Sequence, residues 1–267
     1  MKHRLIMSNM SSGPKRRIKT AENAFEIVDF LHREEHATLG EIANHIELSK
    51  STTHSYLETL IHLDLILKDG NQYELGLKFL AYGGRTRNRH DIYLASKPQL
   101  RYLHTETGLT VHLAIKEREE LVVLERINPD EELRFGGYAG QRSKFHTPAL
   151  GKVILAHLSE ETVDSIISKQ GLPKRTDRSI SNREELEEEL ETVREQGYAI
   201  NDEEEHRNFK GVARPILVDG NIQGAISIAG PKTEMETNSN DIHQLLQSAA
   251  DRIKLQLQYD KVHRTNP

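Results

Sequence analysis

The feature that most constrains the fold is a series of three short helical patterns within residues 20–62. In the first, which covers residues 20–35, Thr20 is placed to cap the helix, and apolar residues recur at a spacing of three and four: Ala24, Ile27, Val28 and Leu31. The second begins at Thr38 and Glu41, because a hydroxyl three residues before a carboxylate forms a capping box. The third follows Ser49 and places these residues on one face: Thr53, Tyr56, Leu57 and Leu60.

After the third helix the spacing changes to the alternation of β-strands. Residues 63–75 alternate around Asp69-Gly70, a pair typical of hairpin turns. Three short helices and a hairpin indicate a winged helix-turn-helix domain over residues 20–83. Residues 1–19, which are polar and basic, are expected to form a disordered tail.

Residues 84–108 are expected to form a linker helix. Gly83-Gly84 interrupts the preceding pattern, and Ser96 is placed to cap a helix that holds Pro98 in its first turn, where proline is tolerated. Gly108 would end this helix. The linker would thus separate the front domain from residues 109–262.

Residues 109–262 mix strand and helix patterns. Strands are expected at 109–116 and 120–128, helices at 149–158, 160–170, 183–196 and 239–262, and a hairpin around Asp219-Gly220. Strands with grouped helices indicate an α+β domain with an antiparallel sheet.

Composition excludes several classes of protein. The chain has 267 residues, enough for two modest domains, and it has no cysteine, which rules out disulfides and cysteine-based zinc or thiol sites. It contains no apolar stretch near the ~20 residues of a membrane helix and no apolar signal core, so we expect a cytoplasmic protein. Residues 1–90 carry 13 Lys and Arg against 11 Asp and Glu, whereas residues 91–267 carry 23 against 30. A mildly basic front and an acidic rear suggest different partners.

The third helix is the candidate DNA reader, because a recognition helix uses its N-terminal residues on base edges in the major groove. Here these residues are Lys50, Ser51, Thr52, His54 and Ser55. We expect Lys50 to contact phosphate, together with Arg16 and Arg17 of the tail, and Thr38 to add a further DNA contact. The alternative is a helical module that binds a protein partner.

Several motifs, in order and spacing, resemble the IclR family of transcription regulators. They are Leu48–Leu60, Tyr73–Gly76, Gly140–Lys152, Gly197–Glu204, Gly211–Ile216 and Gly224–Pro231. The likeness covers about residues 20–260, and the motifs of the rear half are the more specific ones.

The resemblance implies a GAF-like effector domain, assembly into dimers or tetramers, and a pocket between the sheet and the loop around Ala149. By matching positions, the pocket would involve Ala149, Leu150, Asn201 or Asp202, Gly211, Ser227 and Ala229. A helix start at Ala149 would suit an anion, since its free N–H groups and dipole favour negative charge. Small organic acids, sugar acids and aromatic acids are the implied ligand classes. Glu203 and Glu204 would repel an anion, so we expect either that they point outward or that the ligand is neutral on that side.

Three positions depart from the family pattern. Some relatives have a cysteine where this chain has Gly211 and a serine where it has Ala229, and others have an arginine in place of Ser55. The ligand and the operator of better-known members therefore cannot be transferred to this chain.

The sequence thus predicts a ligand-responsive regulator that binds a palindromic operator as a dimer or a dimer of dimers. The first helix and the helix at 96–107 are the candidate joining surfaces. The alternative is a metabolite-binding enzyme or sensor, but no nucleophile, phosphate-loop or dinucleotide motif is present. A zinc site would need ligands such as His146 and His206 with Asp202 or Glu205. These residues do not have the compact spacing of a zinc-binding motif, so we expect no metal and no cofactor.

Overall fold

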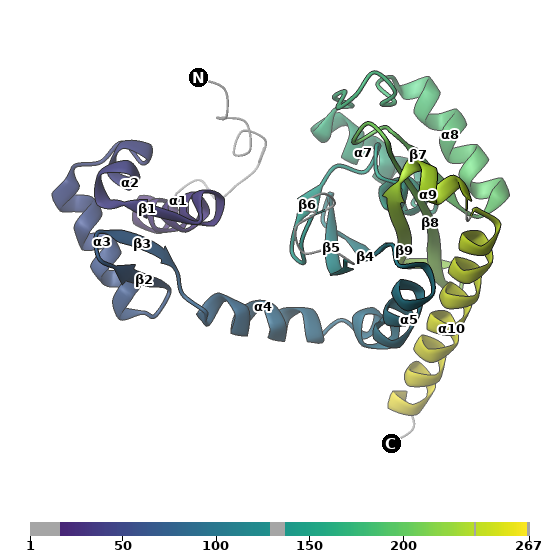
Figure 1. Cartoon of the computed structure of the whole chain (residues 1–267), viewed down its shortest axis with the longest axis horizontal. Helices are drawn as coiled ribbons and strands as arrows, with labels where there is room; N and C mark the ends of the chain where they lie inside the picture. Colours follow the sequence, from purple (N-terminus) through teal and green to yellow (C-terminus); the bar gives the residue numbers. More distant parts are fainter. Residues whose placement is uncertain (1–16, 129–136, 238, 266–267) are drawn as a thin grey trace. The chain divides into compact units, whose positions relative to one another are not determined.

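The computed structural model of the chain describes residues 17–128, 137–237 and 239–265 (Figure 1). Contacts within the chain divide it into two units, with the boundary between Thr86 and Arg87. Arg16, one of the expected phosphate contacts, lies outside the described residues.

The front unit is a winged helix-turn-helix, as the sequence predicts. Its elements are α1 (Lys19–Glu34), β1 (His36–Thr38), α2 (Leu39–His45), α3 (Lys50–His62), β2 (Ile66–Asp69) and β3 (Gln72–Leu75). The three strands form an antiparallel sheet in the order β1-β3-β2. The helices and strands share one apolar core, which includes Ile27, Leu31, Ile42, Leu57 and Ile66.

Two of the three predicted helix caps in this unit are confirmed. Thr38 and Glu41 form both hydrogen bonds of a capping box, and the Ser49 side chain accepts a hydrogen bond from the Thr52 N–H. The prediction for Thr20 is wrong, because α1 begins at Lys19 and no side chain caps it. Strand β1 was not expected from the sequence, because three residues are too few to show an alternation.

The segment expected to be a single linker helix contains two helices, α4 (Lys78–Asn88) and α5 (Asp91–Thr107). Helix α4 continues through Gly83-Gly84, and none of its residues is fully buried. In α5, Ser96 and Pro98 lie inside the helix rather than at its start. Ile92 and Tyr93 explain the earlier start, because both are buried in the rear core and packing outweighs cap preference.

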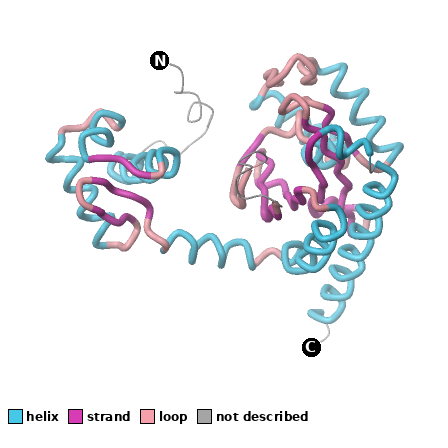
Figure 2. Tube along the Cα trace, in the orientation of Figure 1, coloured by secondary structure: helices cyan, strands magenta, loops and turns pink. Residues whose placement is uncertain are grey.

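The rear unit is built on a six-stranded antiparallel sheet in the order β6-β5-β4-β9-β8-β7. The strands are β4 (Thr110–Glu117), β5 (Glu120–Ile127), β6 (Arg142–Ser143), β7 (Ala199–Asp202), β8 (Phe209–Val218) and β9 (Asn221–Pro231). The remaining helices are α6 (Ala149–Ala156), α7 (Glu160–Gln170), α8 (Arg183–Gln196), α9 (Lys232–Thr237) and α10 (Ser239–Thr265). Figure 2 shows these helices beside the strands. The fold is α+β, as predicted.

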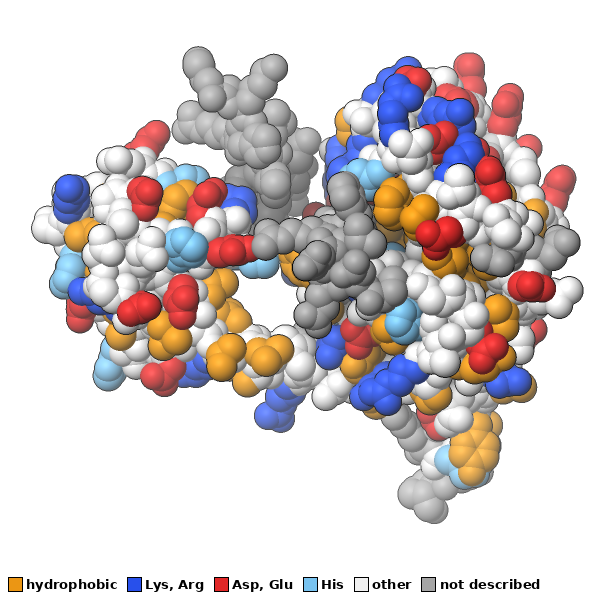
Figure 3. All heavy atoms as spheres, in the orientation of Figure 1, with side chains coloured by type: hydrophobic (Ala, Val, Ile, Leu, Met, Phe, Trp, Pro, Cys, Tyr) orange, Lys and Arg blue, Asp and Glu red, His pale blue; other side chains and the backbone are white. Residues whose placement is uncertain are grey.

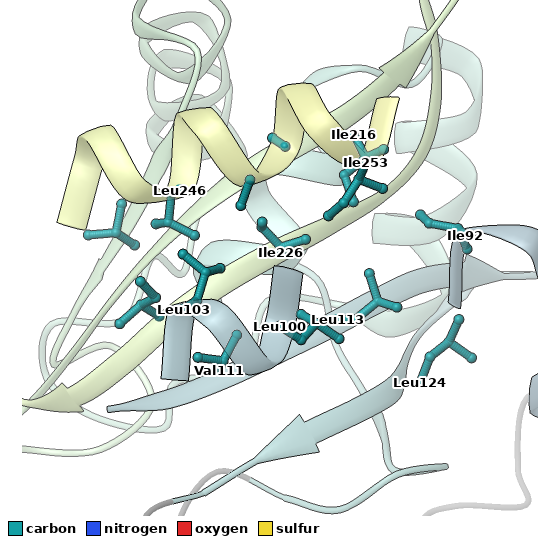
Figure 4. Close-up of a cluster of buried hydrophobic side chains, with 14 of the residues drawn as sticks. Ile92, Leu100, Leu103, Val111, Leu113, Leu124, Ile216, Ile226, Leu246 and Ile253 are labelled. Atoms are coloured by element: carbon teal, nitrogen blue, oxygen red, sulfur yellow. The ribbon is translucent and has the colours of Figure 1, made fainter. Parts of the chain in front are cut away.

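The two faces of this sheet pack against different helices. Side chains of α5 and α10, among them Leu103 and Leu246, point toward one face and form the larger core (Figure 4). Helices α6, α7 and α8 form a second core with small residues of the other face: Ala114, Ala199, Ala213 and Ala225. We call this second side of the sheet the α6 face. Because its residues are small, helix α6 packs closely against the strands on this side.

Candidate functional site

The first turns of α3 present polar side chains to solvent. All five residues expected to read DNA are exposed: Lys50, Ser51, Thr52, His54 and Ser55. The opposite side of α3 is fixed in the core by Thr53, Leu57 and Leu60, all of which are buried. The helix therefore has one anchored side and one free side, which is the arrangement that a recognition helix requires.

Local hydrogen bonds hold several of these polar groups. The Thr52 hydroxyl lies 2.9 Å from the Ser49 hydroxyl, and the Ser55 hydroxyl donates to the Ser51 carbonyl at 3.2 Å. Thr38 is engaged by its capping box, in which its hydroxyl donates to a Glu41 carboxylate oxygen at 2.8 Å. Arg17 is exposed and forms an ion pair of 3.6 Å with Glu22. DNA contacts by these residues remain predictions.

In the rear unit, strand register brings together three of the residues expected to bind the effector. Asn201 lies opposite Gly211 on neighbouring strands, and Gly211 lies opposite Ala229. A Cβ atom added to Gly211 would lie 3.4 Å from the Ala229 Cβ. Ser227 lies two residues before Ala229 on β9 and faces the same side, because side chains alternate along a strand. All four residues thus lie on the α6 face.

The start of α6 completes this surface. Ala149 and Leu150 belong to the same apolar cluster as the small residues of the α6 face. Pro148 precedes them as the N-cap and supplies no side-chain hydrogen bond, although its carbonyl accepts the Gly151 N–H at 2.9 Å. Gly151 permits the tight crossing of the loop before the helix, because a Cβ atom there would lie 2.2 Å from the Phe145 carbonyl oxygen.

The structure distinguishes Asn201 from Asp202. The Asn201 side-chain oxygen accepts the Glu204 N–H at 2.9 Å, which fixes the amide on the α6 face. Asp202 follows in the strand and therefore projects from the other face, where it forms an ion pair of 2.7 Å with Lys232. Of the two candidates, only Asn201 shares a face with Gly211, Ser227 and Ala229.

The expectation that Glu203 and Glu204 both point outward is wrong for Glu204. Its side chain is buried, and one oxygen lies 2.6 Å from Lys152 Nζ, which also contacts Glu189 at 2.7 Å. Burial raises the pKa of Glu204 to about 7, although Lys152 acts in the opposite direction. Glu203 is also buried, with 9% of its surface exposed, and forms ion pairs with Arg178 at 3.1 Å and Lys232 at 3.2 Å, so the outward expectation is wrong for it as well. The buried cation of α6 explains why a carboxylate turns inward here.

Two histidines that the sequence left without a role are buried in this unit. His112 lies on β4 opposite Ser227, and its Nδ1 is 3.4 Å from the Ser227 hydroxyl. His146 Nε2 donates to the Pro173 carbonyl at 3.1 Å, and burial lowers the pKa of its ring. Within the described ranges, no three His, Asp or Glu side chains group as metal ligands. Only strand register, which the sequence alone does not give, could have placed His112 in this site.

The front unit is a winged helix-turn-helix whose recognition helix exposes polar side chains. The rear unit is a separate domain in which a surface of small residues lies beside the start of a helix. Together these features define a DNA-binding regulator that responds to a small molecule. Residues 20–70 match the IclR helix-turn-helix domain, and residues 85–255 match the domain described as bacterial transcriptional regulator IclR C-terminal. The chain belongs to the IclR family of transcription regulators.

Similar proteins extend over nearly the whole chain. The probable HTH-type transcriptional regulator ArcR of Halobacterium salinarum is 32% identical over 255 residues, which cover 93% of this chain and 97% of that protein. The HTH-type transcriptional regulator KdgR of Dickeya chrysanthemi is 28% identical over 246 residues, which cover 91% and 81%. These relatives are transcription regulators.

Solved structures show the same fold. The crystal structure of Thermotoga maritima IclR is 27% identical, with a TM-score of 0.78, and covers 90% of this chain and 99% of its own. An IclR homologue of Microbacterium hydrocarbonoxydans in complex with 4-hydroxybenzoate is 20% identical, with a TM-score of 0.78, and covers the same shares. Among the helices of the described residues, none is long and apolar enough to cross a membrane.

Proposed function

We propose that this regulator binds a palindromic operator as a dimer or dimer of dimers, and that a small organic or sugar acid in the rear domain changes its operator affinity. The observation that carries the DNA-binding role is α3, whose first turns are exposed and polar while its opposite side is locked in the core. We further propose that the protein acts in the cytoplasm and has no catalytic activity.

Two exposed apolar surfaces support assembly. Leu77, which directly precedes α4, and Leu80 within it are 80% and 72% exposed, and Phe25 of α1 is 64% exposed. Orange side chains mark α4 in Figure 3. In contrast, the apolar side of α5 is occupied, because Leu100 and Leu103 are fully buried in the rear core. We therefore propose α1 and α4, rather than the helix at 96–107, as the joining surfaces.

The effector role is supported by the α6 face. Its small residues lie beside the start of α6, which no side chain caps, and the N-terminus of a helix favours a negative charge. The 4-hydroxybenzoate complex of the Microbacterium homologue is a precedent for an acid ligand in this fold. Occupation of the site would then be coupled to DNA binding as a free-energy linkage between two sites.

The test of the DNA-binding role is operator binding by variants of α3, measured by gel shift on the DNA upstream of the protein's own gene. Lys50→Ala should weaken binding to all sequences and flatten the log–log salt dependence by about one unit, since each phosphate contact contributes about −0.9. Thr52→Ala should relax preference at one base pair of each half-site, by about 1–3 kcal/mol.

Two controls separate DNA contact from loss of structure. Lys169→Ala removes an exposed lysine of the rear domain, and Thr59→Ala removes an exposed threonine from the later turns of α3. Neither should change binding. A salt slope near zero for the wild-type protein, or the same selected DNA motif for wild type and Thr52→Ala, would refute the respective role.

A further inference from the structure

An open groove, which we call the α10 groove, follows the exposed side of α10. Leu246 and Ile253 point from this helix into the core (Figure 4), whereas other residues of four successive turns line the groove. The volume of the groove is about 570 Å³, within the range of about 300–1,000 Å³ that is typical of small-molecule sites. Its polar lining includes Arg214 of β8 and these residues of α10: His243, Gln244, Gln247, Ser248 and Arg252.

The α10 groove is separate from the proposed effector site. Ala213 packs on the α6 face, so the next residue of β8, Arg214, projects from the other face of the sheet. Helix α10 packs on that other face. A ligand in the α10 groove would therefore be separated from the α6 face by the sheet itself.

Arg214 is held in a fixed orientation at one end of the groove. Its Nη1 donates a hydrogen bond to the Gly197 carbonyl at 3.2 Å, and its guanidinium lies 5.4 Å from the centre of the Tyr198 ring. Tyr198 in turn contacts His243 edge to face, with ring centres 4.3 Å apart. The guanidinium is thus oriented before any ligand binds, which reduces the entropy lost on binding.

The charge of Arg214 is only partly compensated. Its side chain is half-buried, its Nε atom is buried without a hydrogen-bond partner, and burial lowers the pKa of the guanidinium. Among the described residues that line the groove, Asp251 is the one carboxylate, and it acts on Arg214 from beyond ion-pair distance. Its oxygen instead accepts a hydrogen bond from Gln247 at 2.9 Å. Arg214 therefore retains the capacity to pair with an anion.

Arg252 gives the groove a second guanidinium. It is exposed, and its guanidinium carbon lies 6.0 Å from the centre of the Tyr102 ring. Neither Arg252 nor Arg214 forms an ion pair with a carboxylate in the part of the chain that the structure describes. The two cations thus outnumber the single carboxylate of the groove, and the protein's own acids do not occupy them.

The donors of the groove match a phosphate group. Besides the two guanidinium groups, the Ser248 hydroxyl and the Gln244 amide can donate hydrogen bonds, and guanidinium groups bind phosphate oxygens in pairs. A phosphate monoester carries a charge of about −1.5 to −2 at pH 7 and has three terminal oxygens that accept hydrogen bonds. It therefore suits two cations and several donors better than a single carboxylate does.

We propose that the α10 groove binds the phosphate group of a small metabolite, and that Arg214 and Arg252 contact this group directly. The protein would then have a second ligand site, on the side of the sheet opposite to the α6 face. The site does not depend on the effector proposed above, and the groove can be tested without knowing that effector.

The experiment uses the full-length protein and two pairs of probes that differ by the phosphate group, together with inorganic phosphate. The pairs are glucose 6-phosphate with glucose, and AMP with adenosine. Binding is measured by calorimetry in a buffer without phosphate. At least one phosphate probe should bind with a dissociation constant below about 1 mM, and the unphosphorylated partner of an ester that binds should bind at least about 30-fold more weakly.

Inorganic phosphate identifies the source of the group. If it binds as tightly as the esters or more tightly, the ligand is free phosphate. If it binds at least about tenfold more weakly than one ester, the ligand is a monoester whose remaining atoms also contact the groove.

Variants of the lining then locate the site. Arg214→Gln and Arg252→Gln should each weaken binding of the tightest phosphate probe by about tenfold or more, because each removes a charged hydrogen-bond donor. Asp251→Asn should instead tighten binding by about threefold, because it removes a negative charge beside the phosphate. Lys254→Gln is the matched control, since Lys254 is exposed on α10 but does not line the groove. It should bind the probe as the wild type does.

The proposal is overturned if no phosphate probe binds at about 10 mM, or if a phosphate ester and its unphosphorylated partner bind equally. It is also overturned if Arg252→Gln leaves the affinity unchanged, or if Lys254→Gln weakens binding as much as Arg252→Gln does. Because Arg252 and Asp251 are exposed, their variants decide the assignment even where Arg214→Gln does not fold.

Discussion

Lys152 is a charged residue that the fold places in its core. It is 1% exposed, and its Nζ atom contacts carboxylates from two other segments, Glu189 of α8 and Glu204 of the loop after β7. The Glu204 N–H is also held by Asn201. Because an unpaired buried charge costs several kcal/mol, these contacts tie α6 to the segment that carries Asn201.

At this residue scale, Glu204→Gln should change how stability depends on pH. The pKa of Glu204 is about 7 in the folded protein and its ordinary value is 4.5. Between these values the folded state binds more protons than the unfolded state, so the contribution of this carboxyl is fully present below pH 4.5 and is lost as the pH rises through 7. In Glu204→Gln the free energy of unfolding should not show this decrease with rising pH. The measurement is urea unfolding of the rear domain between about pH 5 and 7.5.

Glu188→Gln is the control for this measurement, because Glu188 lies on the exposed side of α8. Its pH profile should be parallel to that of the wild type. If Glu204→Gln also gives a parallel profile, then Glu204 does not titrate in this range.

Residue pairing is what the sequence could not supply. Gly211, Ala229 and Asn201 were found through family motifs, and strand register confirms that they face one another. The face on which each residue of β5 lies could not be predicted either, because a bulge exchanges Glu125 with Arg126 and nothing in the alternation of that strand indicates an extra residue. The buried ion pair of Lys152 and Glu204 joins positions that are 52 residues apart, so no local pattern contains it.

At the scale of elements, the junction of α6 with its preceding loop should be sensitive to one methyl group. In Gly151→Ala the new Cβ atom would lie 2.2 Å from the Phe145 carbonyl oxygen and 2.6 Å from its Cα, and a backbone cannot give way cheaply. We expect a loss of at least about 2 kcal/mol in the free energy of unfolding, measured with urea.

Gly84→Ala is the matched control, because Gly84 also lies within a helix but a Cβ atom there would meet nothing within 4 Å. It should be neutral or stabilise the protein by up to about 1 kcal/mol, the difference in helix propensity between glycine and alanine. Equal effects of the two substitutions would show that loop crossing does not explain Gly151.

The elements that the sequence predicted well are mostly the helices that are long enough to show several repeats of the apolar spacing. The apolar spacing of α1, α3, α7, α8 and α10 identified each helix, and Asp219-Gly220 marked the hairpin of β8 and β9. The missed elements are short: β6 has two residues, β7 four and α9 six, too few to show a repeat. Helix α4 was missed for another reason, since Gly83-Gly84 breaks helical propensity without breaking the helix.

At the scale of the whole molecule, assembly should depend on α4. Replacing both Leu77 and Leu80 by serine should shift a dimer toward monomer in light scattering at micromolar concentration. Operator affinity should fall with it, because two linked half-site contacts bind far more tightly than one. Assembly should weaken because the substitutions remove exposed apolar surface that the second subunit would bury in the dimer.

Leu94→Ser is the control for this pair, since Leu94 is 45% exposed on α5 and belongs to neither proposed joining surface. It should leave the assembly intact. A double serine variant that stays dimeric and binds the operator normally would place the interface elsewhere.

The boundary between the two units falls inside α4, an exposed helix with no residue committed to either core. The chain can therefore be divided at α4 without cutting through either hydrophobic core, provided that the phase of the helix is kept. Adding one residue to such a helix turns everything after it by about 100°, whereas adding seven restores the direction to within about 20°. A chimeric regulator that exchanges the front unit at α4 should therefore keep the number of helical residues, or change it by seven. Exchange at this helix would combine the DNA specificity of one regulator with the effector specificity of another.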